Sequence, residues 1–151
     1  MGPLDDTDRE VISILQLDGR TSNREIARKL GISEATVRNR VGRLIGDGLI
    51  NIVAVPTPLA VGLTMSAIIG VSVQMRHLDE VVDTITDYRE VRYVGLSTGQ
   101  FDVIIEAFFE DQEQMLEFVT RKLGRLDGVS DVETSVILKV AKFSYEWEIP
   151  D

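Results

Sequence analysis

The sequence predicts an α+β protein of two parts, a short helical region followed by a region of alternating strands and helices. Three observations support this prediction. Helix-start signals followed by apolar residues at helical spacing recur in the first fifty residues. A proline-containing break follows at residues 56–58. Beyond it, β-branched segments alternate with amphipathic ones, and no internal repeat is visible.

Three short helices are predicted in the first fifty residues. Each begins at a capping residue, and these are Thr7, Ser22 and Ser33. In the first two, a glutamate three residues on completes a capping box. Each helix ends at a glycine, and these are Gly19, Gly31 and Gly48. The inward faces are expected to hold Val11, Ile12, Ile14, Leu15 and Leu17, then Ile26, Ala27 and Leu30, then Val37, Val41, Leu44 and Ile45.

The turn between the second and third helices predicts a helix-turn-helix. It consists of Gly31-Ile32-Ser33, and its short length matches that motif. Gly31 supplies the positive φ that such a turn needs, and Ala27 is small where the two helices would cross. Together with the basic charge of this region, described below, these features favour a DNA-binding module.

The region between the two parts is predicted to be a linker. Residues 49–55 alternate in strand fashion and are expected to form a wing or an interdomain strand, and the prolines at 56 and 58 then break regular structure. We therefore expect a winged helix-turn-helix domain at 1–50, a linker with an interdomain strand at 51–62, and a second domain at 63–151.

The second domain is predicted to have the ferredoxin-like βαββαβ plan. The expected strands are 64–74, 91–97, 101–109 and 129–140, and the expected helices are 78–88 and 111–126. Two helices cover only one face of such a sheet, so a partner subunit is expected on the other. The apolar residues available for the two faces include Ile69, Val71, Val73, Val103, Ile105, Val136 and Leu138.

Composition and charge narrow the function. The chain has 151 residues, no cysteine, no apolar run long enough to cross a bilayer and no secretory signal, so a cytoplasmic protein is expected. The net charge of −9 argues against a nucleic-acid partner, but its distribution reverses that argument. Residues 51–151 hold the whole excess, whereas residues 20–43 carry seven basic and two acidic side chains, a local +5. A solvated basic helix face is the alternative explanation of this segment.

Two sets of motifs occur in a fixed order along the chain. The N-terminal set is Leu4-Asp5 with Asp8, Leu17-Asp18-Gly19-Arg20, Ile26-Ala27, Gly31-Ile32-Ser33, Arg40-Val41, Arg43-Leu44 and Gly48-Leu49-Ile50. The C-terminal set is Ser97-Thr98-Gly99-Gln100-Phe101-Asp102, Gly128-Val129 and Thr134. With these motifs the chain resembles the leucine-responsive regulatory protein/AsnC (feast/famine) family from Leu4 to about Lys142.

The resemblance implies a transcription regulator. Such proteins join a winged helix-turn-helix to a ferredoxin-like sensory domain, pair through their sheets into dimers, and often assemble further into octamers. They bind amino acids or related metabolites between sensory domains and regulate metabolic genes. Members that bind amino acids often carry Thr-x-Thr near the start of the last strand. This chain has Val132-Glu133-Thr134 and lacks one hydroxyl, so DNA binding is the better supported expectation.

A DNA-binding surface is predicted on the outward face of the third helix. A step of about 100° per residue places Ala35, Asn39 and Arg43 opposite the apolar face, with Thr36 nearby. Asparagine can pair with adenine and arginine with guanine, whereas flanking arginines suit phosphates. The full predicted set is Ser22, Asn23, Ser33, Glu34, Ala35, Thr36, Arg38, Asn39, Arg40 and Arg43. The alternative is that these are surface side chains, with the serines serving as helix caps.

The predicted effector site consists of Gly99, Gln100, Asp102 and Thr134. The turn at 99–102 offers backbone N–H groups to a carboxylate, Asp102 offers a charge to an ammonium, and Thr134 adds a hydroxyl. The alternatives are a turn-stabilising Asp102 and an ordinary strand threonine. The single histidine, His77, is expected to begin a helix, and neither a metal site nor a cofactor is predicted. The tail with Phe143, Tyr145 and Trp147 fits either an extra strand or a loose end.

Two other functions remain as alternatives. Some proteins of similar architecture decarboxylate a tetrapyrrole, but they need basic and histidine side chains that this acidic second domain lacks. A ligand-sensing module that no longer binds DNA is the other alternative, and the basic segment argues against it. The expected partners are therefore double-stranded DNA, a small-molecule effector with amino acids as candidates, and further copies of this chain, as a homodimer or a higher even oligomer such as an octamer, with no membrane.

Overall fold

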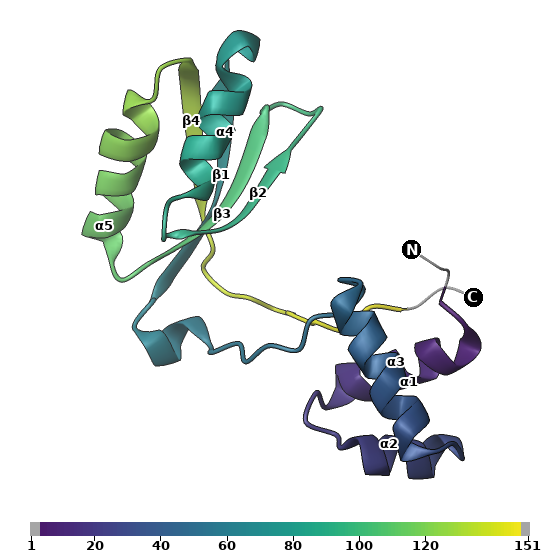
Figure 1. The fold of residues 1–151 in the computed structure, drawn as a ribbon. Helices are drawn as coiled ribbons and strands as arrows, with labels where there is room; N and C mark the ends of the chain where they lie inside the picture. Colours follow the sequence, from purple (N-terminus) through teal and green to yellow (C-terminus); the bar gives the residue numbers. More distant parts are fainter. Residues whose placement is uncertain (1–3, 149–151) are drawn as a thin grey trace. The chain divides into compact units, whose positions relative to one another are not determined.

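The computed structural model describes residues 4–148 and divides the chain into two units, Met1–Val55 with Lys142–Asp151, and Pro56–Ala141. The first unit is helical and the second contains a single antiparallel sheet (Figure 1). The α+β prediction is therefore confirmed. The end of the chain differs from the expected division, because residues 142–148 belong with the helical unit instead of the sheet.

The helical unit consists of α1 (Asp6–Leu17), α2 (Asn23–Leu30) and α3 (Glu34–Gly46). Its core is small, and the buried apolar residues are Val11, Ile26, Ala27, Val37 and Leu44. Two residues expected inside are exposed, Leu17 at 76% and Ile45 at 45%. Both lie in the last turn of their helix, where a short bundle has no neighbouring helix left to cover them.

Local sequence determines most of the helix ends. The Ser22 and Ser33 side chains accept hydrogen bonds from the third residue beyond them, as predicted, and Gly31 ends α2 in the left-handed conformation with φ 69°. The prediction that Thr7 caps α1 is wrong. Asp5 caps α1 instead, in a reciprocal capping box with Asp8. An aspartate is a better N-cap than threonine, and α1 therefore begins at Asp6, one residue before the expected cap.

The predicted wing or interdomain strand is not formed within the part of the chain that the structure describes. Residues 49–57 lie outside regular structure, and a 3₁₀ turn over Pro58–Val61 precedes the sheet. A strand needs a neighbour to pair with, and a single copy of the chain offers none to this segment. The exposed side chains of Ile52 and Val53 are consistent with an unpaired segment.

The sheet unit has the predicted βαββαβ order. Its elements are β1 (Met65–Val73), α4 (Leu78–Thr86), β2 (Val91–Leu96), β3 (Val103–Phe109), α5 (Gln112–Glu117) and β4 (Val129–Val136). The strands lie in the order β2-β3-β1-β4, and all neighbours are antiparallel. This is the strand order of a ferredoxin-like fold. The last predicted helix is broken, because α5 continues as a π-helical turn over Phe118–Lys122 and a 3₁₀ turn over Leu123–Arg125.

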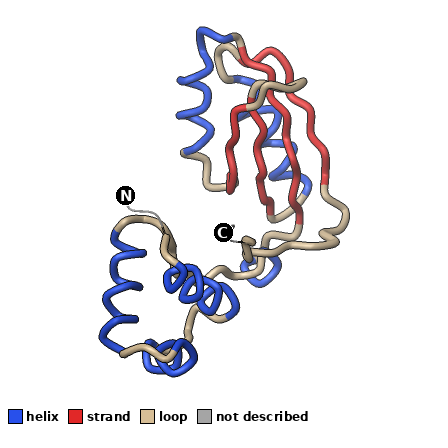
Figure 2. The backbone as a smooth tube through the Cα atoms, turned by 90° about the vertical axis from the view of Figure 1, so that its right-hand side faces the viewer, coloured by secondary structure: helices blue, strands red, loops and turns tan. Residues whose placement is uncertain are grey.

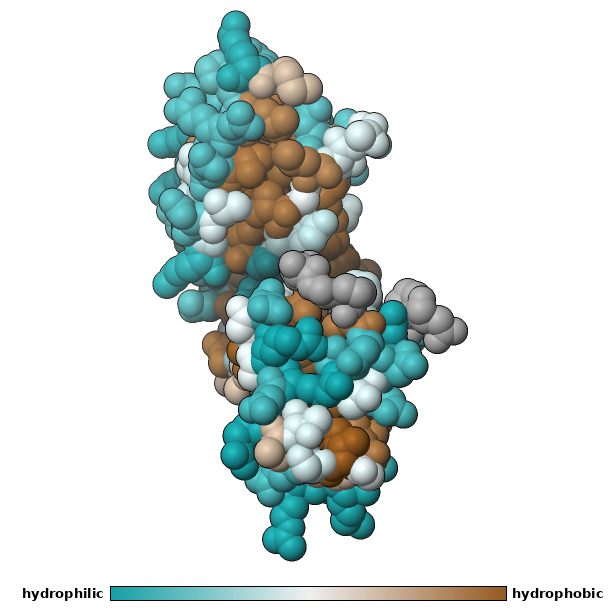
Figure 3. Space-filling view, turned by 45° about the vertical axis from the view of Figure 1, so that its right-hand side comes forward, coloured by the Kyte–Doolittle hydropathy of each residue, from teal (hydrophilic) through white to brown (hydrophobic). Residues whose placement is uncertain are grey.

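The helices cover one face of the sheet (Figure 2). Alternate residues of β1 and β3 point to that face and are buried with Val81, Ile85, Phe118 and Leu123 from the helical segments. The other face carries Ile68, Ile104 and Phe108 among polar residues. Leu138 was expected in the sheet, but it lies beyond the end of β4 and is 95% exposed. Figure 3 shows apolar side chains gathered on the surface of this unit, bordered by hydrophilic ones.

Candidate functional site

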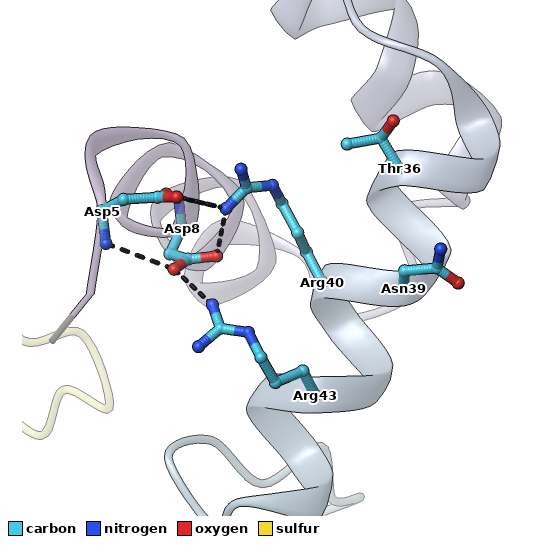
Figure 4. A pocket seen from close by; sticks show the side chains of 6 residues that line it. All are labelled: Asp5, Asp8, Thr36, Asn39, Arg40 and Arg43. Carbon is cyan, nitrogen blue, oxygen red and sulfur yellow. Dashed lines mark hydrogen bonds and ion pairs between the residues drawn. The ribbon is translucent and has the colours of Figure 1, made fainter. Parts of the chain in front are cut away.

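Helix α3 presents polar and small side chains on the side opposite its buried residues. Val37 and Leu44 are fully buried, whereas Ala35, Thr36 and Asn39 are exposed. The side-chain amide of Asn39 has no hydrogen-bond partner among the described residues. It points away from the cluster of Asp8, Arg40 and Arg43 side chains (Figure 4). An exposed amide on a helix that follows a short turn can reach a base edge in the major groove.

The arginines of α3 fall into two classes. Among residues 4–148, Arg38 pairs only with Glu34, four residues earlier on the same helix, at 3.1 Å between Nη2 and Oε1. Both side chains are largely solvated, at 64% and 48% exposure. Such surface pairs contribute little free energy, so the Arg38 guanidinium is available to another anion at little cost.

Arg40 and Arg43 point toward α1 (Figure 4). The Nη1 atom of Arg40 lies 2.6 and 2.8 Å from the carboxylate oxygens of Asp5, and 2.8 Å from Oδ1 of Asp8. Arg43 donates a hydrogen bond to the other carboxylate oxygen of Asp8. These two arginines were expected to contact DNA, but in the structure their guanidinium groups are held by two carboxylates at the start of α1.

Asp8 is the buried centre of this cluster, with a side chain only 2% exposed. Burial alone would raise the pKa of Asp8, but the hydrogen bonds from Arg43 and Arg40 outweigh it and lower the pKa overall. The hydrogen bonds from Arg40 likewise lower the pKa of Asp5, and the two carboxylates raise the pKa of Arg40. The lowered pKa values of Asp5 and Asp8 and the raised pKa of Arg40 keep these three groups charged near neutral pH.

The role of Asp5 and Asp8 in holding the arginines is not evident from the sequence, because 32 to 35 residues separate the partners. The signal that could have revealed it is matched spacing. The two acids stand three residues apart at the start of α1, and the two arginines stand three residues apart on α3. With Thr36 and Asn39 these four residues line a surface pocket of about 450 Å³.

The helix starts retain their capping role. The Ser22 hydroxyl accepts a hydrogen bond from the Glu25 N–H, and the Ser33 hydroxyl accepts one from the Thr36 N–H at 3.0 Å. Ser33 also shares a hydrogen bond with the Thr36 hydroxyl at 2.8 Å. Asn23 is half-buried in the first turn of α2. These interactions stabilise the helices whether or not a phosphate lies nearby.

In the sheet unit, Gly99 and Gln100 are exposed in the loop between β2 and β3. The Gly99 N–H donates to the Ser97 hydroxyl at 3.1 Å. The carboxylate of Asp102 accepts a hydrogen bond from the Val73 N–H at 2.8 Å, and the Asp102 N–H donates to the Val71 carbonyl. One oxygen of Asp102 therefore joins this loop to the end of β1, and only the remaining carboxylate oxygen is available to a ligand.

Thr134 is not brought together with this loop. It pairs with Ile69 on β1, which is fully buried, so its side chain lies on the face that the helices cover. Its hydroxyl oxygen is buried without a hydrogen-bond partner among the described atoms. Val132 pairs with Val71 and packs against the same core, so the hydroxyl missing at this position would also face the helices.

A second buried acid lies in the sheet unit. The Glu90 side chain is 5% exposed, and the ammonium of Lys122 lies 2.8 Å from its Oε1. Burial alone would raise the pKa of Glu90, but the hydrogen bond from Lys122, a backbone hydrogen bond and the charges of Lys122 and Arg89 together outweigh it and lower the pKa. Lys122 also lies over the rings of Tyr88 and Phe118, 5.1 and 5.7 Å from their centroids. The sequence gives no sign of this pair, since it depends on the broken last helix.

Metal binding and membrane insertion find no support in the described residues. Within 4–148, no three or more histidine, cysteine or acidic side chains gather as a metal site would require. No helix in that range has the length and apolar character needed to span a bilayer.

Two family models match the chain. The model for a winged helix-turn-helix DNA-binding domain matches residues 4–51. The model for the Lrp/AsnC ligand binding domain matches residues 66–147. The HTH-type transcriptional regulator FL11 of Pyrococcus furiosus is 34% identical over 146 residues, which are 96% of each chain. The regulator LrpA of Pyrococcus horikoshii is 34% identical over 140 residues, covering 92% of this chain and 99% of that protein.

Solved structures agree with these relatives. The crystal structure of a transcriptional regulator from Neisseria meningitidis in complex with L-Met has a TM-score of 0.90, 28% identity and 97% coverage of both chains. Escherichia coli AsnC shares the fold, with a TM-score of 0.87 and 20% identity. The match covers 94% of this chain and 97% of that one. These relatives are transcription regulators, so the predictions of a DNA-binding regulator and of a non-enzyme are confirmed and the decarboxylase alternative is not supported. The chain belongs to the Lrp/AsnC family of DNA-binding transcription regulators.

Proposed function

We propose that the exposed face of α3 reads the operator. The observation that carries this proposal is the exposed amide of Asn39, which has no hydrogen-bond partner among the described residues. It lies near Thr36 and Arg38 on the helix that follows the turn. In this proposal Asn39 contacts a base edge, with Ala35 and Thr36 beside it, and Arg38 exchanges its weak pair with Glu34 for a phosphate. Ser22, Asn23 and Ser33 lie at helix starts, where backbone N–H groups also suit phosphates.

The test compares two variants on a panel of duplexes selected by the wild-type protein. Asn39→Ala is expected to lose discrimination between sequences by about 1–3 kcal/mol, because a bidentate base contact is removed. Arg38→Ala is expected to weaken binding to every duplex and to lower the log–log salt slope by about one. Equal effects of the two variants across the panel would contradict the assignment of the helix face.

The sheet unit is proposed to bind a small metabolite with amino-acid chemistry at the loop between β2 and β3. The exposed Gly99 and Gln100 offer backbone and amide groups, and the free oxygen of Asp102 offers a charge to an ammonium. The L-Met complex of the Neisseria relative supports this class of ligand. Thr134 faces the helices and serves the site only if a partner subunit or a rearrangement opens that face.

A thermal-shift screen of amino acids and related metabolites tests this site on wild type and on Gln100→Ala. A ligand that stabilises the wild type and not Gln100→Ala supports the loop as its site. Gln100 is the better probe, since Asp102 also holds the end of β1 and its loss would disturb the sheet. Equal stabilisation of both proteins would place the ligand elsewhere.

Assembly is proposed to be a homodimer that pairs through the uncovered sheet face and continues to higher even oligomers. Ile68, Ile104 and Phe108 supply apolar surface on that face, and Phe101 packs directly over Gly70 within it. A ligand between subunits changes DNA binding only if it binds one assembly more tightly than another. Light scattering with and without ligand measures this, and a monomer at micromolar concentration would contradict it. A regulator that binds chromosomal DNA is expected in the cytoplasm.

A further inference from the structure

We propose that Asp5 and Asp8 limit the overall DNA affinity of the helical unit, because they withhold Arg40 and Arg43 from the phosphate backbone. The proposal rests on the role proposed above for α3 as the reading helix. It concerns two residues of α1 and its cap that lie outside the expected DNA-binding set.

The first step is the geometry of the ion pairs. Arg40 reaches both carboxylates within 2.6 to 2.8 Å, and Arg43 donates to the same buried Asp8. The Asp8 side chain is 2% exposed with both arginines in place, and their departure would cost it the charge-assisted hydrogen bonds that it accepts from them. A phosphate on the surface therefore competes with two carboxylates that already hold these arginines.

The second step is the contrast with Arg38. Its partner Glu34 is 48% exposed and is solvated as soon as the arginine leaves. The exposed fractions of the arginine side chains follow the same order, at 64% for Arg38, 38% for Arg43 and 27% for Arg40. Of the three arginines on α3, one is thus free to contact DNA and two are neutralised within the protein.

The third step is the consequence for recognition. Phosphate contacts strengthen binding to every sequence alike, whereas base contacts distinguish sequences. Neutralising Arg40 and Arg43 lowers the affinity for all DNA while leaving Asn39 in place. The carboxylates lie in the pocket that Thr36 and Asn39 border, so they cancel the positive charge that would attract a phosphate there. The two aspartates therefore lower total affinity and its salt dependence, and they leave the discrimination made by base contacts unchanged.

The main test is Asp5→Asn, alone and combined with Asp8→Asn. Asparagine caps a helix as well as aspartate, so α1 keeps its start while losing the charge that holds Arg40. Asp6→Asn is the matched control, because this substitution removes the same charge one residue away. Asp6 forms no ion pair with the described residues. Binding is measured by fluorescence anisotropy against salt, on a duplex selected by the wild-type protein and on an unrelated duplex of equal length.

The log–log salt slope of the double variant is expected to steepen by about one for each released arginine. Affinity for the unrelated duplex and for the selected one should rise by a similar factor, because the released arginines add phosphate contacts and no base contacts. Asp6→Asn should leave the salt slope unchanged. The proposal is overturned if the double variant keeps the wild-type slope and affinities, or if Asp6→Asn reproduces its effect.

A second comparison holds even if the aspartate variants do not fold. Arg43→Gln leaves Asp8 paired with Arg40, and it is compared with Arg38→Gln. The salt slope is expected to fall by about one for Arg38→Gln and by less than half of that for Arg43→Gln. Equal losses would show that Arg43 contacts phosphate and would overturn the proposal. If neither Arg38→Gln nor Asn39→Ala changes DNA binding, α3 is not the reading helix and the proposed function fails with it.

Discussion

The two units of the chain each bury one carboxylate, and they use it differently. Asp8 in the helical unit has two arginine partners that are themselves partly solvated, whereas Glu90 in the sheet unit has Lys122 at hydrogen-bond distance and Arg89 only at 3.8 Å. The partners of Asp8 come from the helix that is proposed to read DNA. The partner of Glu90 comes from the π-helical turn after α5 and lies over two aromatic rings. The same chemistry thus holds arginines of the proposed reading helix in one unit and contributes to packing in the other.

The two units also differ in the size of the apolar core that surrounds each ion pair. The helical unit has a small core of five buried apolar residues, and the ion-pair cluster adds a contact between α1 and α3. The sheet unit has a larger core that spans both β1 and β3, and the main cost of breaking its ion pair is that Glu90 stays buried without its close partner. Because the two cores are separate, each unit is expected to unfold in its own transition.

The largest effect is expected from Lys122→Ala. It leaves Glu90 buried, with only Arg89 nearby, so the sheet unit should lose about 3 kcal/mol of unfolding free energy, the low end for a buried pair because Lys122 is itself 38% exposed. Lys122→Ala combined with Glu90→Gln is the control and should recover part of that loss, because no buried charge remains. Urea denaturation followed by circular dichroism measures both. A loss below about 1 kcal/mol for the single variant would mean that water reaches Glu90.

A smaller loss is expected from Asp8→Ala. The partners left behind, Arg40 and Arg43, are partly exposed and can turn to water, so the helical unit should lose about 1–3 kcal/mol. The matched control is Asp6→Ala, which removes the same charge from the first turn of α1 outside the cluster. The measurement is the lower-temperature transition in differential scanning calorimetry. A larger loss than that of Lys122→Ala would reverse the comparison between the two units.

Acid should weaken both units, by less than either substitution. The pKa values of Asp8 and Glu90 are lowered by folding, so their contribution is complete above the pKa values of the unfolded chain. It is lost as pH falls from about 5 through the lowered values. A protonated carboxyl still accepts hydrogen bonds, which limits the loss. Melting curves between pH 3 and 7 should be flat above about pH 5, and a decline that begins near pH 6 would point to another group.

The smallest effect is expected from Gln16→Ala. The Gln16 side chain accepts a hydrogen bond from the Trp147 N–H at 2.5 Å and donates one to the Trp147 carbonyl at 3.1 Å. It thereby attaches the aromatic tail to α1, and losing both bonds should cost about 1 kcal/mol or less. Limited proteolysis near Phe143 should become faster with no change in the melting of either core, whereas Ser13→Ala on the same helix should have no effect on cleavage.

Much of the architecture follows from the sequence by itself. Contacts within a few residues determine the starts of α2 and α3 and the left-handed Gly31. Apolar periodicity predicts the order of strands and helices, and both signals are present in the sequence. The outward position of Asn39 follows from the same periodicity, because Val37 and Leu44 determine which side of α3 is buried.

Only the tertiary structure decided where the charged and polar side chains of the sites point. Arg40 and Arg43 turn toward α1 because packing brings Asp5 and Asp8 within reach from 32 to 35 residues away. Thr134 faces the helices because its register with Ile69 places it there, and a shift of one residue would have turned it outward. Residues 49–55 alternate like a strand and form none, since pairing requires a neighbour that a single chain does not contain. Local signals fix local structure, whereas the partner of a charge and the face of a strand residue depend on distant segments.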